Sequence, residues 1–305
     1  MNHFEILLLA IILDAVLGEP DWLWSRVAHP VQFIGGCINW FDKRLNVAPL
    51  QKLKGFVVLG ILVIAAGVVG WILTALPDYG LLEGIIVAIF LAHKSLVQHV
   101  MNVAKALGQS LPDGRAEVAK IVGRTTDQMQ PDDVVRGAIE SAAENFSDGV
   151  IAPAFWYLVL GLPGVLIYKV VNTADSMIGY KTEKHGDFGY ASAKLDDILN
   201  WLPARLTSGL ICLTSHPVKS FKVVLDDAPL HRSPNAGWPE AAMAAVLNIA
   251  LAGPRIYDGK QVDYPFVNAA ARHRLSPKDI LRAVRTLNIV WAGFAAVMLL
   301  GTVLV

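Results

Sequence analysis

A stripe of charged residues at helical spacing is the first candidate site in this sequence. Arg136, Glu140, Glu144 and Asp148 recur every four residues, so on a helix they share one face. Carboxylates placed this closely repel one another unless solvent, an arginine or a cation compensates them. Mg²⁺ favours one or two carboxylates together with waters and phosphate oxygens. The stripe therefore predicts metal and nucleotide chemistry, and the alternative is a solvated helix face paired with Arg136.

The residues around this stripe supply further polar groups. Pro131, followed by two aspartates, predicts the start of a helix that carries the stripe. Asn145 and Ser147 add oxygen ligands beside it, and the segment Gly123–Asp127 (GRTTD) lies shortly before it. The helix runs directly into the apolar segment IAPAFWYLVL, which places the polar groups at a membrane boundary.

Two further clusters combine carboxylates with side-chain amides. The first comprises Asn172, Asp175 and Ser176, and the second comprises Asp196, Asp197 and Asn200. In each cluster the spacing places the polar groups on one side or on adjacent turns of a helix. The first cluster directly follows an apolar segment, where an unpaired carboxylate is costly to bury. This favours a buried polar site over local helix capping.

A fourth candidate is the segment HRSPNAGWPE at residues 231–240. Its two prolines and one glycine predict an irregular loop. His231 is a candidate acid–base group because imidazole titrates near neutral pH, although a lone histidine is more often structural. Arg232 is predicted to hold a phosphate, and the alternative is an ion pair with Asp226 or Asp227.

The familiar nucleotide and metal motifs are missing from the sequence. It contains neither a GxxxxGK[ST] phosphate loop nor a GxGxxG turn, and no HExxH or CxxC spacing. Cys37 and Cys212 are isolated. Any nucleotide therefore binds at a site of another kind.

The elements that must position these groups are largely apolar. Of the 305 residues, 54% are hydrophobic and only 17% charged, against about 25% charged in ordinary soluble domains. Residues 55–76 and 286–305 are uncharged and long enough to cross a bilayer, which takes about 20 residues. Shorter apolar stretches are predicted to be short, tilted, re-entrant or protein-buried helices: residues 4–17, 81–92, 150–171, 206–213 and 241–252.

The placement of positive charge predicts the orientation. All 26 Lys and Arg lie between Arg26 and Arg285, and cytoplasmic loops carry the excess of these residues. Both termini are therefore predicted to be periplasmic. A break at residues 161–164 (GLPG) is predicted to split the apolar segment 150–171 into a hairpin or re-entrant pair, which keeps residues 181–205 cytoplasmic.

The pattern as a whole predicts an all-α, multi-pass helical membrane protein with short, broken or re-entrant helices and cytoplasmic helical loops. Strand-like alternation is absent, and neither a repeat nor a linker divides the chain. A single domain over residues 1–305 is the simplest organisation.

Several long and unusual segments resemble the CobD/CbiB family of cobalamin biosynthesis. The resemblance rests on LGEP, HPV, GRTTD, IESAAENFSDGVIAPAFWY, VNTADSMIGYKTEKHGDFGYASAKLDDILNWLPARL and HRSPNAGWPEAA, in this order over residues 10–265. It implies an adenosylcobinamide-phosphate synthase in the inner membrane, with its active site facing the cytoplasm. Such an enzyme couples adenosylcobyric acid to (R)-1-aminopropan-2-ol or its O-phosphate by ATP-dependent amide formation.

The resemblance also implies cofactors, partners and residue roles. ATP and Mg²⁺ would act with a corrinoid substrate in a lipid bilayer, without nucleic acid, and other late enzymes of the pathway are candidate partners. The predicted catalytic residues are Glu140, Glu144, Asp175 and Asp196, and the predicted metal ligands are Glu140, Glu144 and Asp148. The predicted substrate- and phosphate-binding residues are Arg124, Asp127, Asn145, Asn172, Lys181, Asp197, Asn200, Arg205, His231 and Arg232.

Two other classes of function compete with this interpretation. Broken helices and intramembrane acids also occur in transporters, but here the acids gather at segment ends on one predicted side. A membrane sensor or regulator of the same fold is the second alternative, and the dense Asp, Glu, Asn and Arg blocks argue against it.

Overall fold

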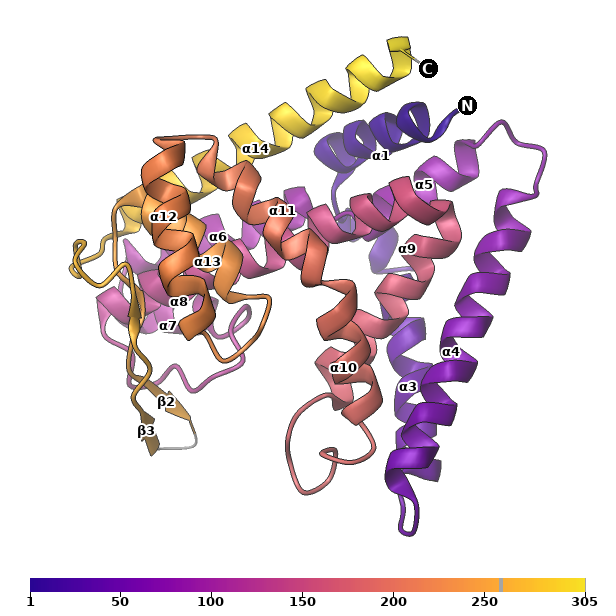
Figure 1. Ribbon diagram of the computed structural model, residues 1–305, viewed down its shortest axis with the longest axis horizontal. Coiled ribbons are helices and arrows are strands. Elements are labelled where there is room, and N and C mark those ends of the chain that lie inside the picture. The colour runs from indigo at the N-terminus through magenta and orange to yellow at the C-terminus, as the bar shows by residue number, and fades with distance from the viewer. Residues whose placement is uncertain (258–259, 305) are drawn as a thin grey trace. The chain divides into compact units, whose positions relative to one another are not determined.

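The computed structural model describes residues 1–257 and 260–304, and helices make up most of it (Figure 1). The chain forms two compact units, each assembled from separate stretches of sequence. The first unit comprises Met1–Ala92, Ala152–Leu202 and Met298–Val305, and the second comprises His93–Ile151 and Pro203–Val297. The predicted all-α class is confirmed. The single domain over residues 1–305 stays a prediction.

The helices of the first unit come from the N-terminal and central parts of the chain. They are α1 (His3–Leu17), α2 (Asp21–Trp24), α3 (Pro30–Leu45), α4 (Gln51–Thr74), α5 (Leu81–Phe90), α9 (Ala152–Ile178) and α10 (Tyr190–Leu199). Helix α4 packs along α9, and α3 and α10 also contact α9. Helix α9 is therefore the central element of this unit.

The second unit surrounds one buried helix. Its elements are α6 (His93–Leu107), α7 (Leu111–Val118), α8 (Pro131–Phe146), the π-helical turn Ser147–Ile151, most of α11 (Trp201–Cys212), α12 (Pro217–Asp227), the 3-10 turn Ala228–Leu230, α13 (Gly237–Leu247) and most of α14 (Pro277–Leu304). Helices α6, α7 and α13 all pack against α8. Helix α8 is thus enclosed on several sides, which explains why Arg136, Glu140 and Ser141 are buried.

Four helical segments are long and apolar enough to cross a membrane within the described chain. They are Gln51–Thr74, Leu81–Leu107, Pro131–Ile178 and Pro277–Leu304. The first and last contain the two spans that the sequence predicts most clearly. A multi-pass membrane protein is therefore supported, and the orientation stays a prediction.

The predicted break in the apolar segment 150–171 is confirmed at Gly161. This residue has φ 65° and ψ −155°, which interrupts α9 in the middle, and Figure 1 shows α9 as two helical arms joined by a bend. Glycine adopts this positive φ without the steric cost that a Cβ atom brings. Pro163 follows at the start of the second arm, where its missing N–H costs little.

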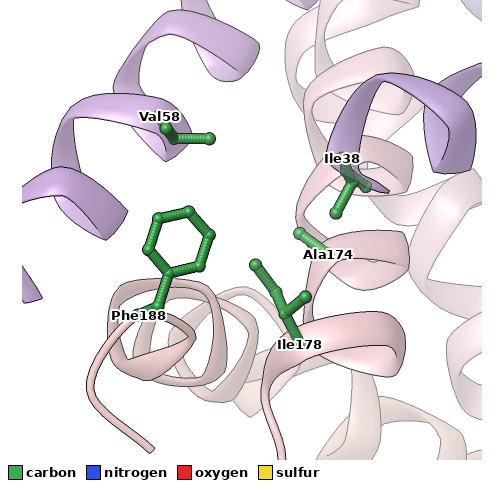
Figure 2. Close-up of a cluster of buried hydrophobic side chains, with 5 residues drawn as sticks. All are labelled: Ile38, Val58, Ala174, Ile178 and Phe188. Atoms are coloured by element: carbon green, nitrogen blue, oxygen red, sulfur yellow. The ribbon is translucent and has the colours of Figure 1, made fainter. Parts of the chain in front are cut away.

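The apolar core of the first unit lies where α3, α4 and α9 meet the loop before α10. Figure 2 shows Ile38, Val58, Ala174, Ile178 and Phe188 directed toward one another, and all five are buried. Phe188 therefore anchors the polar segment 179–189 to the helices.

Two small ribbons are an exception to the helical pattern. Strands β1 (Leu251–Ala252) and β4 (Phe266–Val267) pair antiparallel, as do β2 (Arg255–Tyr257) and β3 (Lys260–Val262). Helix α13 ends at Leu247 because Asn248 adopts a left-handed conformation. The predicted apolar helix over 241–252 is therefore shorter than expected, and these strands are too short for sequence alternation to reveal them.

The segment 231–240 is only partly the irregular loop that the sequence predicts. Residues 231–236 are non-helical, but α13 already begins at Gly237, and Pro239 lies in its first turn. Proline is tolerated there because the first helical N–H groups have no partner within the helix. Glu240 is consequently a helix residue and not a loop residue.

Candidate functional site

Helix α8 carries the predicted acidic stripe into the interior of the second unit. Pro131 occupies its first turn, and the Gln130 N–H donates to Asp133 Oδ2 at 3.0 Å, so the predicted helix start is confirmed. Every residue of α8 from Val134 to Ala143 is buried, and Glu140 is only 4% exposed. The solvated-face alternative does not apply to Glu140.

Two arginines and a backbone amide hold the carboxylate of Glu140. Arg124 Nη2 lies 3.2 Å and Arg255 Nη2 lies 3.0 Å from Glu140 Oε2. The backbone N–H of Ala252 donates to Glu140 Oε1 at 2.7 Å. Arg136 pairs instead with Asp133, at 2.9 Å. The two guanidinium groups and the backbone N–H compensate this buried carboxyl group for part of its lost hydration.

A second buried acid, Glu240, lies beside this cluster. It is 2% exposed, and its Oε2 lies 3.9 Å from Arg255 Nη2. Burial, together with repulsion from Glu140 and Glu144, raises the pKa of Glu240 well above its ordinary range. Glu240 therefore tends to keep its proton, whereas Glu140 is paired with positive charge.

His231 completes the cluster on the side of Glu240. Its Nε2 lies 3.7 Å from Glu240 Oε1, and its Nδ1 accepts a hydrogen bond from the Ser233 N–H at 3.1 Å. Burial and the positive charge of Arg255 lower the pKa of His231. A neutral imidazole whose Nδ1 is an acceptor carries its proton on Nε2, toward Glu240.

A cavity of about 320 Å³ opens beside these ion pairs. Its lining includes Arg124, Thr125, Gln128, Asp133, Arg136, Ala252, Arg255 and Phe266. The Arg136 guanidinium also lies over the Phe266 ring, 5.5 Å from its centroid. Residues 252–255 and Phe266 thus form one wall, and α8 and the segment before it form another. A smaller cavity next to it is lined by His231, Arg232, Arg255 and Tyr264.

A different polar network lies in the first unit. Asp196 accepts hydrogen bonds from Asn172 Nδ2 at 3.2 Å and from Asn200 Nδ2 at 3.0 Å. The Tyr168 hydroxyl donates to Asn200 Oδ1 at 2.9 Å. Burial raises the pKa of Asp196, although the two amide hydrogen bonds oppose this shift. The two carboxylate–amide clusters of the sequence are therefore partly brought together.

The predicted magnesium ligands do not assemble into a metal site. Among the described residues, no three His, Cys, Asp or Glu side chains are grouped closely enough to hold a metal ion. The Glu140 carboxylate is engaged by two guanidinium groups, Glu144 is exposed, and Asp148 lies in the π-helical turn. These carboxylates do not fit a pre-formed protein cage for Mg²⁺, and their role as metal ligands stays a prediction.

Comparison with known proteins identifies the family. The model of the family described as "CobD/Cbib protein" matches residues 7–287. The chain belongs to the CobD/CbiB family. The Cobalamin biosynthesis protein CobD of Rhizobium meliloti is 50% identical to it, over 92% of this chain and 90% of the relative. The protein of that name from Rhodobacter capsulatus is 42% identical, over 100% of this chain and 99% of the relative. No solved structure matches the chain.

Other residues that the sequence predicts for a CobD/CbiB site lie outside these two networks. Asp127, Asn145 and Lys181 are exposed, and Asp175 is half-buried on α9. Arg205 lies in the second unit, with its guanidinium 4.3 Å from the Trp238 ring centroid and its Nη1 3.4 Å from Asn235 Oδ1. Asp197 lies 3.4 Å from Lys194. The roles of these residues stay predictions.

The sequence-based prediction missed two central residues of this CobD/CbiB chain. Arg255 and Glu240 both contact the buried cluster, but neither was predicted as a site residue. A lone acid opening the apolar run EAAMAAVL could have indicated Glu240, because ionisable groups in apolar segments are usually paired. Arg255 directly follows the apolar segment LAGP, and the same argument could have indicated it as a paired residue.

Proposed function

We propose that this chain is an ATP-dependent amide-forming ligase of cobalamin biosynthesis. It joins a side-chain carboxylate of adenosylcobyric acid to the amine of (R)-1-aminopropan-2-ol or its O-phosphate. The product is adenosylcobinamide or its phosphate. Membership of a cobalamin-biosynthesis family supports the pathway. The observation that carries the proposal is the cavity lined by Arg124, Arg136 and Arg255 and backed by buried carboxyl groups.

The proposed reaction has two steps. A corrin carboxylate oxygen attacks the terminal phosphorus of ATP, so that an acyl phosphate forms and ADP leaves. The amine nitrogen then attacks the acyl carbon, the C–O bond to phosphate breaks, and the ammonium proton passes to a base. Both steps develop negative charge on phosphate oxygens, which fixed guanidinium groups stabilise in a water-poor site.

The bases and ligands for these steps are taken from the sequence-based predictions. Glu144 of the second unit and Asp196 of the first unit are alternative candidates for the acceptor of the amine proton. The raised pKa of Asp196 suits a group that must bind a proton. Mg²⁺ is proposed to arrive with the ATP phosphates, since it keeps waters and phosphate oxygens as ligands. No step is assigned to a magnesium ion held by the protein alone.

We propose that the protein spans the inner membrane several times, with both termini in the periplasm. The confinement of all 26 Lys and Arg to residues 26–285 supports this orientation. Reporter fusions at residues 1 and 305 test it. Both should report a periplasmic location, and a cytoplasmic location for either end would contradict the orientation.

Product formation by the purified full-length chain in detergent tests the reaction. Adenosylcobyric acid and ATP are incubated with each amine in turn, and the products are identified by mass spectrometry. We expect an ATP-dependent mass increase that matches amide formation, with one amine preferred. Transport is impossible in detergent, so this product would distinguish a ligase from a transporter. The absence of product with both amines would overturn the proposed function.

A further inference from the structure

The arginine-lined cavity of the second unit has the charge of an anion site. Among its described lining residues, Arg124, Arg136 and Arg255 are positive, and only Asp133 is negative. Thr125 and Gln128 add neutral hydrogen-bonding groups. Three guanidinium groups against Asp133 in the lining and Glu140, which pairs with two of them, leave a net charge of +1. This charge favours an anionic ligand.

The guanidinium groups are fixed before any ligand enters. Glu140 lies behind the cavity and holds both Arg124 and Arg255, and Asp133 holds Arg136. The side chains of Arg124 and Arg255 are 9% and 10% exposed. Fixed donors cost little conformational entropy when a ligand binds, because their rotamers are already set.

An unsatisfied donor points to a missing ligand at this site. The Nε of Arg124 is buried and has no hydrogen-bond partner within residues 1–257 and 260–304. Buried donors of this kind are rare in proteins, and a bound ligand or water normally satisfies them. The donor belongs to a residue that lines the cavity.

The size of the cavity limits what can enter. At about 320 Å³, it lies at the lower end of the range of roughly 300–1,000 Å³ for small-molecule sites. A corrin ring does not fit, whereas a phosphate with a short substituent does. Arginine forks match the geometry of phosphate oxygens.

We propose that the cavity bounded by Arg124, Arg136 and Arg255 binds the phosphate group of a substrate. This inference rests on the proposed function and names one subsite of it. Two substrates of the ligation carry such a group: ATP at its terminal phosphate, and aminopropanol phosphate. The shared chemistry is a phosphate held by three arginines.

Kinetics with both amines distinguish the two sources. Arg255→Gln and Arg124→Gln should each raise one Michaelis constant about 10- to 150-fold, the range for a hydrogen bond to a charged group. If the constant for aminopropanol phosphate rises and that for aminopropanol does not, the amine phosphate binds here. If the constant for ATP rises with either amine, the terminal phosphate of ATP binds here. Arg274→Gln, at an exposed arginine of the same unit, is the control.

A binding measurement keeps the test independent of turnover. Inorganic phosphate should raise the melting temperature of the purified chain in detergent, and acetate at equal ionic strength should not. The stabilisation should disappear in Arg255→Gln. Equal stabilisation by acetate would show a carboxylate site and overturn the inference. A chain that makes product but responds to neither anion, and whose arginine variants keep normal Michaelis constants, would overturn the inference while leaving the proposed function intact.

A third variant serves if the arginine variants fold poorly. A Cβ at Gly137 would lie 2.9 Å from Arg124 Nη2, so Gly137→Ala displaces the guanidinium while every charge remains. It should weaken phosphate stabilisation in the same direction by a smaller factor. Unchanged stabilisation in Gly137→Ala would count against a role for Arg124.

Discussion

The two polar networks of this chain stabilise a buried carboxyl group with different kinds of partner. In the second unit, the Glu140 carboxyl group pairs with two arginines at 3.2 and 3.0 Å. In the first unit, Asp196 is held by the neutral amides of Asn172 and Asn200 at 3.2 and 3.0 Å. The distances to the partners are alike, but the charges around the two carboxyl groups differ.

This difference indicates different uses. An ion pair fixes charge in place, and removing one partner leaves the other uncompensated. Neutral amide partners can accommodate both the charged and the neutral carboxyl group, so the group can bind and release a proton. The second unit is therefore suited to binding an anion, and the network around Asp196 is suited to exchanging a proton.

Glu140→Gln should cause the largest loss of stability among these variants. It removes the carboxylate between Arg124 and Arg255, and the loss of one partner in a buried ion pair costs about 3–5 kcal/mol. Thermal unfolding in detergent should show this loss. Glu117→Gln is the control, because its partner Lys120 is 58% exposed and a surface pair contributes about 1 kcal/mol or less. Equal losses in the two variants would show that Glu140 is not a structural anchor.

Glu144→Gln separates a buried acid from an exposed one on the same helix. Glu144 is exposed, so the variant should insert normally and lose no more than about 0.5 kcal/mol of stability. Turnover should fall by at least about 100-fold, the lower range for a general acid–base group. Asp226→Asn, at another exposed acid, is the control. Near-normal turnover over a range of Mg²⁺ concentrations would show that Glu144 is only a surface residue.

Asp196→Asn should change how stability depends on pH. Burial raises the pKa of Asp196 above its ordinary value of 3.8. Above that value the unfolded chain releases the proton first, so stability falls as pH rises through the raised pKa. The variant lacks this proton and should show a smaller fall as the pH rises above the ordinary pKa of 3.8. Loss of the hydrogen bonds lowers the stability by a similar amount at every pH. The slope of the melting temperature against pH is therefore the quantity to compare. Identical slopes would refute the proton-exchanging role.

Arg232→Ala should have the smallest effect of these changes. Arg232 is exposed on the wall of the small cavity beside Arg255. An exposed charge contact contributes at most about 1 kcal/mol, or roughly fivefold in affinity. The Michaelis constant for aminopropanol phosphate should rise by up to this factor, and that for aminopropanol should not. If the Michaelis constants for both amines rise alike and the yield of purified protein falls, Arg232 only orders its loop.

Local features of the fold could be predicted from the sequence. Helical class, the start of α8 at Pro131 and the break at Gly161 all follow from composition, capping residues and backbone restrictions. Each depends on residues that are neighbours in sequence. The short ribbons within 251–267 could not be predicted in the same way, because they depend on pairing and not on propensity.

The partners of the charged residues could not be predicted either. Spacing on α8 correctly placed Glu140 and Glu144 on one helix, but it could not show that one is buried and the other exposed. Arg255 lies 115 positions after Glu140, and no periodic pattern connects them. The alternative interpretation paired Arg136 with the acids of the stripe, yet Arg136 pairs with Asp133 in the preceding turn. The ion pairs depend on tertiary contacts, which sequence spacing does not reveal.

The interleaving of the two units limits when the chain can fold during synthesis. The first unit includes Met298–Val305, and Gly301 packs so closely on the Phe4 ring that a Cβ atom would not fit between them. The ribosome must therefore translate nearly all of the chain before this contact can form. Such long-range contacts raise contact order and slow folding, because a long loop must close first. A chain that stalls before residue 298 would leave Phe4 uncovered, and quality-control proteases could recognise it as incomplete.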